Sequence, residues 1–235
     1  MTDSSEVPDR AAGGGRQDRA EEPPKWLTHE VVYTEAVAEA CESPAGRSQL
    51  RKVVTSAGEV HGWELPRQVA RLVPGSREQR FAYGAVAGMF AEQAPSFSAG
   101  RDDAAGRPER TRMWRPSWGD LGWSVHLGVR QGVLHEDRAA ERLKQLAQLS
   151  DPVALVRYGR QLVGRLAAEG VPVNWPVLLR DLRRWPHKRV DIANDWFFSY
   201  AHAVAPGGED GLVQAGAAGA GASDNTNDSS NEEDS

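Results

Sequence analysis

The segment GVPVNWPVLLRDLRRWPHKRVDIANDW, residues 170–196, indicates the architecture of this chain more clearly than any other segment. Asn174 with Pro176 close behind is typical of a helix start, because asparagine caps helices and proline is tolerated in a first turn. At 3.6 residues per turn, one face carries the apolar side chains of Trp175, Leu178, Leu179, Leu182 and Trp185. Arg180 and Arg184 lie on the other face, with Arg183 on its flank. The pattern predicts a core helix with an outward row of cations, which suits an anionic polymer better than a small substrate.

The two ends of the chain have compositions that do not support a folded core. Residues 1–24 are rich in glycine, proline and mixed charge, and residues 205–235 contain glycine, alanine, serine, asparagine and acids without an aromatic residue. Such segments bury too little apolar surface to offset the entropy of ordering. We therefore predict disordered tails at 1–24 and 205–235 and a folded region between them.

The net charge of −5 hides an uneven distribution of charge along the 235 residues. The two tails hold 3 of the 28 basic and 13 of the 33 acidic residues, which leaves a net charge of +5 on residues 25–204. A basic folded region favours an anionic partner. The acidic C-terminal tail either competes for the basic face or keeps the chain soluble, and we favour the second reading.

Helical patterns cover nearly the whole folded region, and no alternating strand pattern or internal repeat is present. The fold class is therefore predicted to be all-α. We divide it into two small helical bundles, 25–134 and 135–204, and place a long basic loop at 95–117. Expected helices run from Thr28 to Ala40, Ser43 to Ala57, Pro66 to Val73, Ser76 to about Gln93, Trp118 to Gln131, Glu136 to Leu149, Asp151 to Gly170 and Asn174 to Trp185, with a last one to about Ala203. Pro186 should end the helix that begins at Asn174.

Sequence signals of catalysis and of cofactor binding are absent. Cys41 is the only cysteine, so an internal disulfide and a cysteine-based zinc site are excluded, and a buried thiol is expected. Nucleotide-binding loops and the H-E-x-x-H motif are missing, and no histidine pair has helical ligand spacing. We predict neither enzyme activity nor a cofactor. Without a signal peptide or a long apolar run, we expect a cytoplasmic protein with no membrane partner.

Basic residues recur on the outer faces of several predicted helices. Arg138 and Arg142 lie four residues apart, and Arg157, Arg160 and Arg165 avoid the apolar stripe of their helix. Together with Arg47, Arg51, Lys52, Arg180 and Arg184 they could line a track that binds phosphates without reading bases. Each arginine by itself has a plainer reading, in which it is solvated or paired with an acid such as Asp181 or Glu141. The hypothesis therefore depends on their convergence in space.

Three blocks of sequence point to a known family. Gly46, Arg47, Leu50, Arg51 and Lys52 fit the pattern G-R-x-x-L-R-[RK], and Glu141, Arg142 and Leu143 form a second block. The third and most specific block, Val173 to Trp185, fits V-x-[ND]-W-x-x-L-[LA]-R-x-L-x-x-W. In these blocks the chain resembles the CasB family, the small subunit of the type I-E CRISPR interference complex Cascade. The resemblance spans about residues 28–203.

The resemblance implies a non-catalytic, all-helical subunit that serves antiviral defence. It implies assembly with a second copy and with the backbone and large subunits of Cascade. It also implies that basic faces bind the hybrid of crRNA with the target strand, and the displaced non-target DNA strand, which would stabilise the R-loop. By resemblance, Arg51, Lys52, Arg142 and Arg180 contact nucleic acid, and we add Arg47, Arg138 and Arg184 from the same basic faces.

Two alternatives from other classes remain open. In the first, the chain is a free-standing helix-turn-helix regulator whose Trp175 helix enters a major groove. In the second, it is an assembly scaffold whose arginines pair with acidic surfaces of its partners. A helical enzyme is a distant third.

Overall fold

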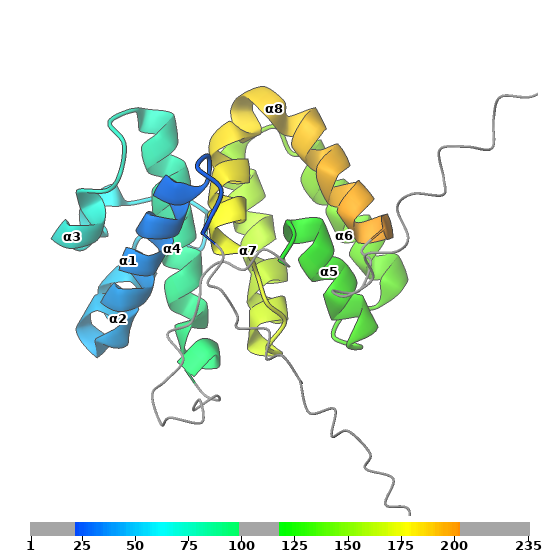
Figure 1. The fold of residues 1–235 in the computed structure, drawn as a ribbon, viewed down its shortest axis with the longest axis horizontal. Coiled ribbons are helices and arrows are strands. Elements are labelled where there is room, and N and C mark those ends of the chain that lie inside the picture. The colour runs from blue at the N-terminus through cyan, green and yellow to red at the C-terminus, as the bar shows by residue number, and fades with distance from the viewer. Residues whose placement is uncertain (1–21, 99–117, 203–235) are drawn as a thin grey trace, which may run out of the picture. The chain divides into compact units, whose positions relative to one another are not determined.

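Helices and the turns between them make up the part of the chain that the computed structural model describes, residues 22–98 and 118–202 (Figure 1). The elements are α1 (Thr28–Glu42), α2 (Pro44–Arg51), the 3-10 helix η1 (Gly62–Glu64), α3 (Arg67–Ala70), α4 (Arg77–Ser98), α5 (Leu121–Arg130), α6 (Glu136–Gln148), α7 (Pro152–Ala168) and α8 (Trp175–His202). Within those ranges the only strand-like feature is an isolated antiparallel bridge between Val54 and Val60. The predicted all-α class is confirmed.

Predicted helix starts at a serine-proline pair and an aspartate-proline pair are confirmed. The Ser43 side chain accepts a hydrogen bond from the Gly46 N–H, and Asp151 accepts from the N–H groups of Val153 and Ala154. A proline follows each cap directly, where its missing N–H costs nothing. Gly170, two residues beyond the end of α7, has a φ of 75°, as expected for a glycine that stops a helix.

The second helix is shorter than predicted. It ends at Arg51, and the chain then forms a tight hairpin over residues 53–61. In this hairpin the Thr55 N–H donates to the Glu59 carbonyl, and the His61 N–H donates to the Val53 carbonyl. Two adjacent valines and a threonine favour extended backbone over helix, and Gly58 supplies the positive φ of 88° that the turn needs. Ala57, expected to face inward, is exposed.

Gly84 and Gly88 bring this hairpin against α4. A Cβ atom on Gly84 would overlap the Val60 side chain, and one on Gly88 would overlap the Val54 side chain. The two glycines, one turn apart, therefore serve close packing. Their neighbour, however, is the hairpin rather than another helix.

One contiguous hydrophobic cluster runs through the described helices. It includes Tyr33 and Phe90 from the first half of the chain and Leu155, Trp175 and Trp185 from the second. Because α4 packs on both α7 and α8, buried side chains from 25–134 and 135–204 share this core. The division of the folded region into two bundles stays a prediction.

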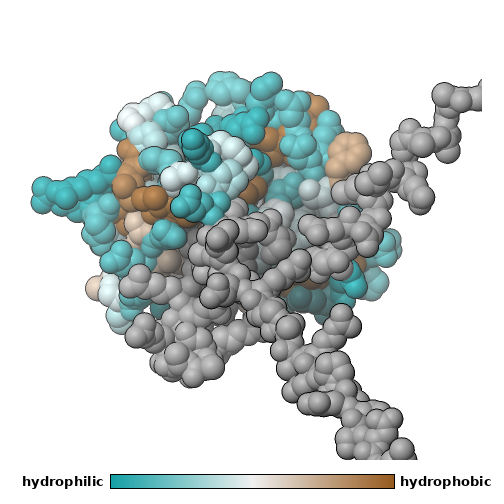
Figure 2. Space-filling view, viewed as in Figure 1, coloured by the Kyte–Doolittle hydropathy of each residue, from teal (hydrophilic) through white to brown (hydrophobic). Residues whose placement is uncertain are grey.

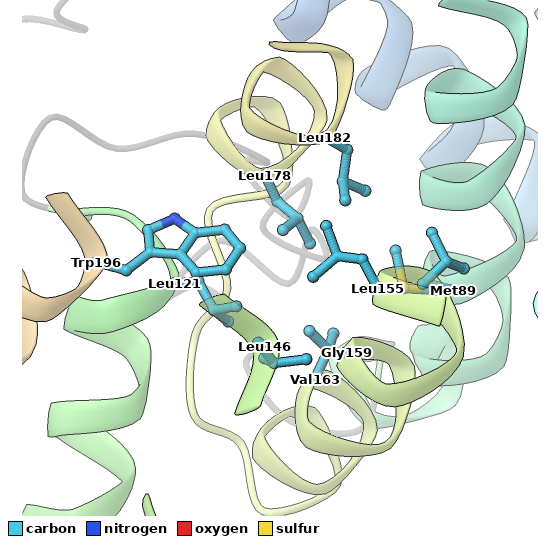
Figure 3. A pocket seen from close by; sticks show the side chains of 10 residues that line it. Met89, Leu121, Leu146, Leu155, Gly159, Val163, Leu178, Leu182 and Trp196 are labelled. Atoms are coloured by element: carbon cyan, nitrogen blue, oxygen red, sulfur yellow. The ribbon is translucent and has the colours of Figure 1, made fainter. Parts of the chain in front are cut away.

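The centre of the core lies where α4, α5, α6, α7 and α8 meet (Figure 3). Its walls are apolar, and the space left among them is only about 10 Å³. A water molecule needs polar partners as well as room, so this interior is packed by side chains. The five apolar residues predicted for the face of the Trp175 helix are all buried, as is Cys41.

The helix that begins at Trp175 does not end at Pro186, contrary to the prediction. Helical structure continues to His202, and the break falls at Lys188, whose φ of −133° and ψ of 25° are not helical. Pro186 cannot donate to the carbonyl four residues before it, which weakens the helix there. The two halves stay together because Trp185 stacks on Trp196, with ring centroids 5.1 Å apart.

Two further predictions concern the ends of elements. α4 continues to Ser98, beyond the expected end near Gln93 and into the segment predicted as a loop at 95–117. The remainder of that loop, residues 99–117, lies outside the described residues. So do the predicted tails, apart from residues 22–24. Among the helices of the described ranges, none is long and apolar enough to span a membrane.

Candidate nucleic-acid interface

The basic residues of α2 have different surroundings although they lie within one helix and its cap. Arg47 donates from Nε and Nη2 to the Cys41 carbonyl, at 3.2 and 3.1 Å, and so satisfies a carbonyl in the last turn of α1. Arg51 donates from Nε to the carbonyl of Ala91 in α4 at 3.1 Å. Pro95, four residues after Ala91, has no N–H to fill that position. Lys52 is exposed, and its ammonium makes no hydrogen bond or ion pair with the described residues.

The two arginines of α6 are both available to a ligand. Arg138 and Arg142 are exposed, and neither forms a hydrogen bond or ion pair within the ranges that the structure describes. Their helix buries its other face through Ala139, Leu143 and Leu146. The two guanidinium groups therefore share one solvent-facing side of α6, as their spacing predicted.

Two of the three arginines on the first half of α8 are paired with buried acids. Arg180 donates from Nε and Nη2 to Oδ1 of Asp181, at 3.1 and 2.9 Å, and its guanidinium lies 4.8 Å from the ring centre of Trp26. Arg183 Nη1 lies 2.8 Å from Oε1 of Glu30 in α1. Both carboxylates are almost fully buried. Pairing with an acid, the plainer reading of these arginines, is thus confirmed for Arg180. Arg184 is exposed.

Asp181 holds the two halves of α8 together. Its Oδ2 accepts a hydrogen bond from Nε1 of Trp196 at 2.9 Å, while Oδ1 receives Arg180. Burial raises the pKa of Asp181, and the Arg180 charge beside it acts in the opposite direction. Removing either donor would leave a buried carboxylate short of a partner, which is costly.

A partly buried carboxylate, Asp120, joins the start of α5 to the end of α8. Its Oδ1 accepts from the Trp123 N–H at 3.1 Å, and its Oδ2 accepts from the Ser199 hydroxyl at 2.8 Å. Burial raises the pKa of Asp120 to about 6, while the hydrogen bond from Ser199 acts to lower it. The contacts of Asp120 were not predicted from the sequence, although an aspartate just before an apolar run is a recognisable N-cap signal.

The structure brings some of the seven predicted residues together and separates others. Arg180 and Arg184 lie on one half of α8, beside α1 and α4. α2 and α6 lie at opposite sides of the described helices in Figure 1, so Arg51 and Lys52 are not neighbours of Arg138 and Arg142. Four of the seven predicted residues are exposed and form no hydrogen bond or ion pair with the described residues, namely Lys52, Arg138, Arg142 and Arg184. In the same ranges no cluster of potential metal ligands is present.

Comparison with known protein families identifies the family to which the chain belongs. The model of the family described as CRISPR-associated protein Cse2 matches residues 46–200, which is more than half of the sequence. The chain therefore belongs to the Cse2 family. This confirms the family that the three sequence blocks predicted. A search of curated proteins finds no match.

Solved structures show the same fold. A chain of a "CRISPR RNA-guided surveillance complex" is similar at 27% identity with a TM-score of 0.57, over 74% of this chain and 92% of that one. A chain of a pre-nicking form of such a complex is similar at 28% identity with a TM-score of 0.56, over 75% and 93%. CasB from Thermobifida fusca is 16% identical with a TM-score of 0.52, over 74% and 95%, and supports the fold alone.

Proposed function

We propose that the chain is a non-catalytic small subunit of a type I-E CRISPR Cascade effector complex, acting in antiviral defence in the cytoplasm. The observation that carries the proposal is the family match over residues 46–200. Supporting it, chains of RNA-guided surveillance complexes resemble this one along more than nine-tenths of their own length. The proposed partners are the backbone and large subunits, a second copy of the chain, crRNA, and both strands of the target DNA.

The proposed role is to stabilise the R-loop through backbone contacts. Exchange of a DNA duplex for an RNA–DNA hybrid is nearly balanced in free energy, so modest additional contacts shift it. Cations that touch phosphates provide such contacts without reading sequence. The exposed cations best suited to this are Lys52, Arg138, Arg142 and Arg184. Arg47, Arg51 and Arg180 contribute less in this proposal, because each already satisfies an internal acceptor.

The burial of the first turn of α8 argues against the helix-turn-helix alternative. Such proteins place the N-terminal residues of a recognition helix against base edges. Here Asn174, Trp175 and Val177 are buried. The Asn174 side-chain amide also donates to the Trp118 carbonyl at 2.7 Å. This helix end is occupied by the core and is not presented to a major groove.

The test uses the complex assembled with guide RNA and the full-length chain. The variant K52A/R138A/R142A/R184A removes the four exposed cations, and K25A/R130A removes two exposed cations from outside the proposed interface. At about 0.5 kcal/mol for each exposed contact, the four substitutions should shorten the R-loop lifetime roughly 30-fold. Their incorporation into the complex should be unchanged, and the control should behave as the parent chain does.

Two other outcomes separate the alternatives. An unchanged R-loop lifetime with normal incorporation would reject the nucleic-acid role and leave the assembly scaffold. Reduced incorporation of the four-residue variant, with the chain folded, would show that the cations bind partner subunits instead.

A further inference from the structure

A groove of about 580 Å³ lies between the hairpin that follows α2 and the start of α4. Glu59, Val60 and Trp63 line one side of it, and Arg77, Arg80 and Phe81 line the other. Its volume is in the range of ligand sites, about 300–1,000 Å³. None of these residues belongs to the interface predicted from the sequence.

Trp63 is the most exposed of the large hydrophobic residues that the structure describes, with 75% of its surface accessible. A tryptophan normally buries most of its ring, so an indole this open is available for a contact. The ring stacks on His61, with centroids 4.4 Å apart and planes inclined by 17°. Stacking fixes one face of the indole against the protein and leaves the other side open.

The element that carries Trp63 is firmly anchored. Val54 and Val60 of the hairpin press against the glycines of α4. Arg160 donates to the Thr55 carbonyl while it also pairs with Glu92 of α4. Trp63 itself lies in the short helix η1, directly after the hairpin. The backbone that carries Trp63 is therefore held in place before any ligand binds, and stacking on His61 restricts the ring, which lowers the entropy cost of binding.

Arginines line this groove together with Trp63, and others lie in and next to α3, which contributes Ala70 to the groove. Arg77 and Arg80 belong to the first turn of α4, and Arg67 and Arg71 belong to α3 and its C-cap. All four are exposed, and none forms a hydrogen bond or ion pair through its side chain with another described residue. The acid of the groove, Glu59, lies 4.0 Å from His61. Figure 2 shows hydrophilic residues gathered over the α3 end, at the left of the view.

We infer that this groove binds a single strand of nucleic acid, with one unpaired base stacked on Trp63 and the neighbouring phosphates held by Arg77 and Arg80. An open aromatic face beside a row of cations is the combination that single-strand binding proteins use. An apolar peptide segment would fill the groove without using the four unpaired arginines. The inference rests on the proposed function in one respect, since the strand that it assigns to this groove is the displaced DNA.

Fluorescence anisotropy with the isolated full-length chain tests the inference. One probe is a labelled oligothymidylate of about 15 nucleotides, and the other is a strand of the same length with abasic sites throughout. W63A should weaken binding of oligothymidylate roughly five- to 150-fold, the range for loss of one stacked base, and should leave the abasic strand unaffected. W63F should retain most of the affinity.

The arginine variant has a different expected signature. R77A/R80A should weaken binding of both probes and lower the log–log salt slope by about 1.4, at about 0.7 for each single-strand phosphate contact. F198A removes an exposed aromatic residue of α8, and K25A/R130A removes two exposed cations, so these variants are the matched controls. Circular dichroism and melting confirm that every variant is folded.

Several results would overturn the inference. They are failure of the parent chain to bind oligothymidylate, equal binding by W63A and the parent, and an equal loss by W63A on both probes. A protein ligand for the groove would appear as reduced incorporation of W63A into the complex with oligonucleotide binding intact. The proposed function is tested separately, because the variant K52A/R138A/R142A/R184A leaves the groove untouched.

Discussion

Arg180 and Arg183 differ from Arg184 in forming an ion pair with a buried carboxylate. Asp181 neutralises the first and Glu30 the second, and both acids are excluded from water. A paired arginine has less charge to offer a phosphate than an exposed one, and breaking a buried pair is costly. Of these three arginines, Arg184 is therefore the one whose charge is open to a phosphate.

The raised pKa of Asp120 predicts how stability depends on pH. Burial moves the pKa of this carboxyl from its usual 3.8 to about 6, so ionisation costs more in the folded chain than in the unfolded one. The stability that the protonated form contributes is complete below about pH 4 and is lost as the pH rises through 6. D120N keeps an acceptor for the Trp123 N–H and cannot ionise.

The free energy of unfolding, measured in urea at pH 4 and pH 7, checks this prediction. From pH 4 to pH 7, the free energy of unfolding of D120N should increase relative to that of the parent chain, by at most about 3 kcal/mol. An equal difference between the two proteins at both pH values would show that Asp120 does not titrate in this window.

Two helical glycines predict opposite effects of the same substitution. A Cβ on Gly122 would overlap the backbone of Trp196, whereas one on Gly159 meets nothing within 4 Å. G122A should destabilise the fold by about 1–3 kcal/mol or more, since the obstacle is main chain of another helix. G159A should stabilise it by about 0.5–1 kcal/mol, because alanine loses less backbone freedom. The free energies of unfolding of both variants, measured in urea, test this prediction. Equal effects of the two substitutions on stability would contradict the packing of α5 on α8.

At the scale of residues, the sequence predicted burial better than it predicted pairing. The five apolar side chains of the Trp175 helix recur with helical spacing, so their burial follows from a local pattern. The partners of Arg183 and Asp120 come from other helices distant in the chain, namely Glu30 in α1 and Ser199 in α8. The spacing of residues within one helix does not indicate which residue of another helix will pair with them.

At the scale of elements, most helix ends were predictable and two interruptions were not. Caps at Ser43 and Asp151 are local signals and were predicted correctly. The break in α8 falls at Lys188 rather than at Trp185, because stacking of Trp185 on Trp196 and the Asp181 contact hold the chain helical past the proline. The prediction of helix over residues 53–57 is wrong, since the 53–61 hairpin is too short for an alternating pattern to emerge.

The contact between the hairpin and α4 predicts that substitutions of Gly84 and Val60 have coupled effects on stability. G84A should destabilise the fold by about 1–3 kcal/mol, because its new methyl group occupies the space of the Val60 side chain. V60A should also destabilise it, by loss of partly buried methyl groups that pack against the core. The double variant G84A/V60A should cost less than the sum, since the smaller side chain makes room for the new one.

A double-mutant cycle of urea unfolding free energies measures this coupling. We expect the double variant to recover at least about 0.5 kcal/mol relative to additivity. Strict additivity would mean that Gly84 and Val60 do not touch.

At the scale of the whole molecule, the exposed cations do not form one continuous row. α2 and α6 lie apart (Figure 1), and the groove beside Trp63, lined by Arg77 and Arg80, belongs to neither of them. The family and the all-α class were predictable, because the third sequence block combines helical spacing with a specific set of tryptophans and leucines. The positions of distant cations relative to one another were not predictable from the sequence, because they depend on how the helices pack rather than on the pattern within any one helix.

The proposed function therefore requires separate contacts along a long nucleic acid, at Lys52, at Arg138 and Arg142, and at Arg184, rather than the single track on which the sequence hypothesis depended. Contacts of this kind add to the lifetime of an open complex in proportion to the phosphates neutralised, and they are indifferent to base sequence. The guide RNA would then carry all of the sequence recognition.

The salt dependence of target binding by the assembled complex tests this account most directly. With about 0.9 for each duplex phosphate contact, K52A/R138A/R142A/R184A should reduce the log–log salt slope by up to about 3.6. The reduction should be the same on two unrelated targets, each with its matching guide. A slope equal to that of the parent complex, or a change confined to one target sequence, would contradict the account.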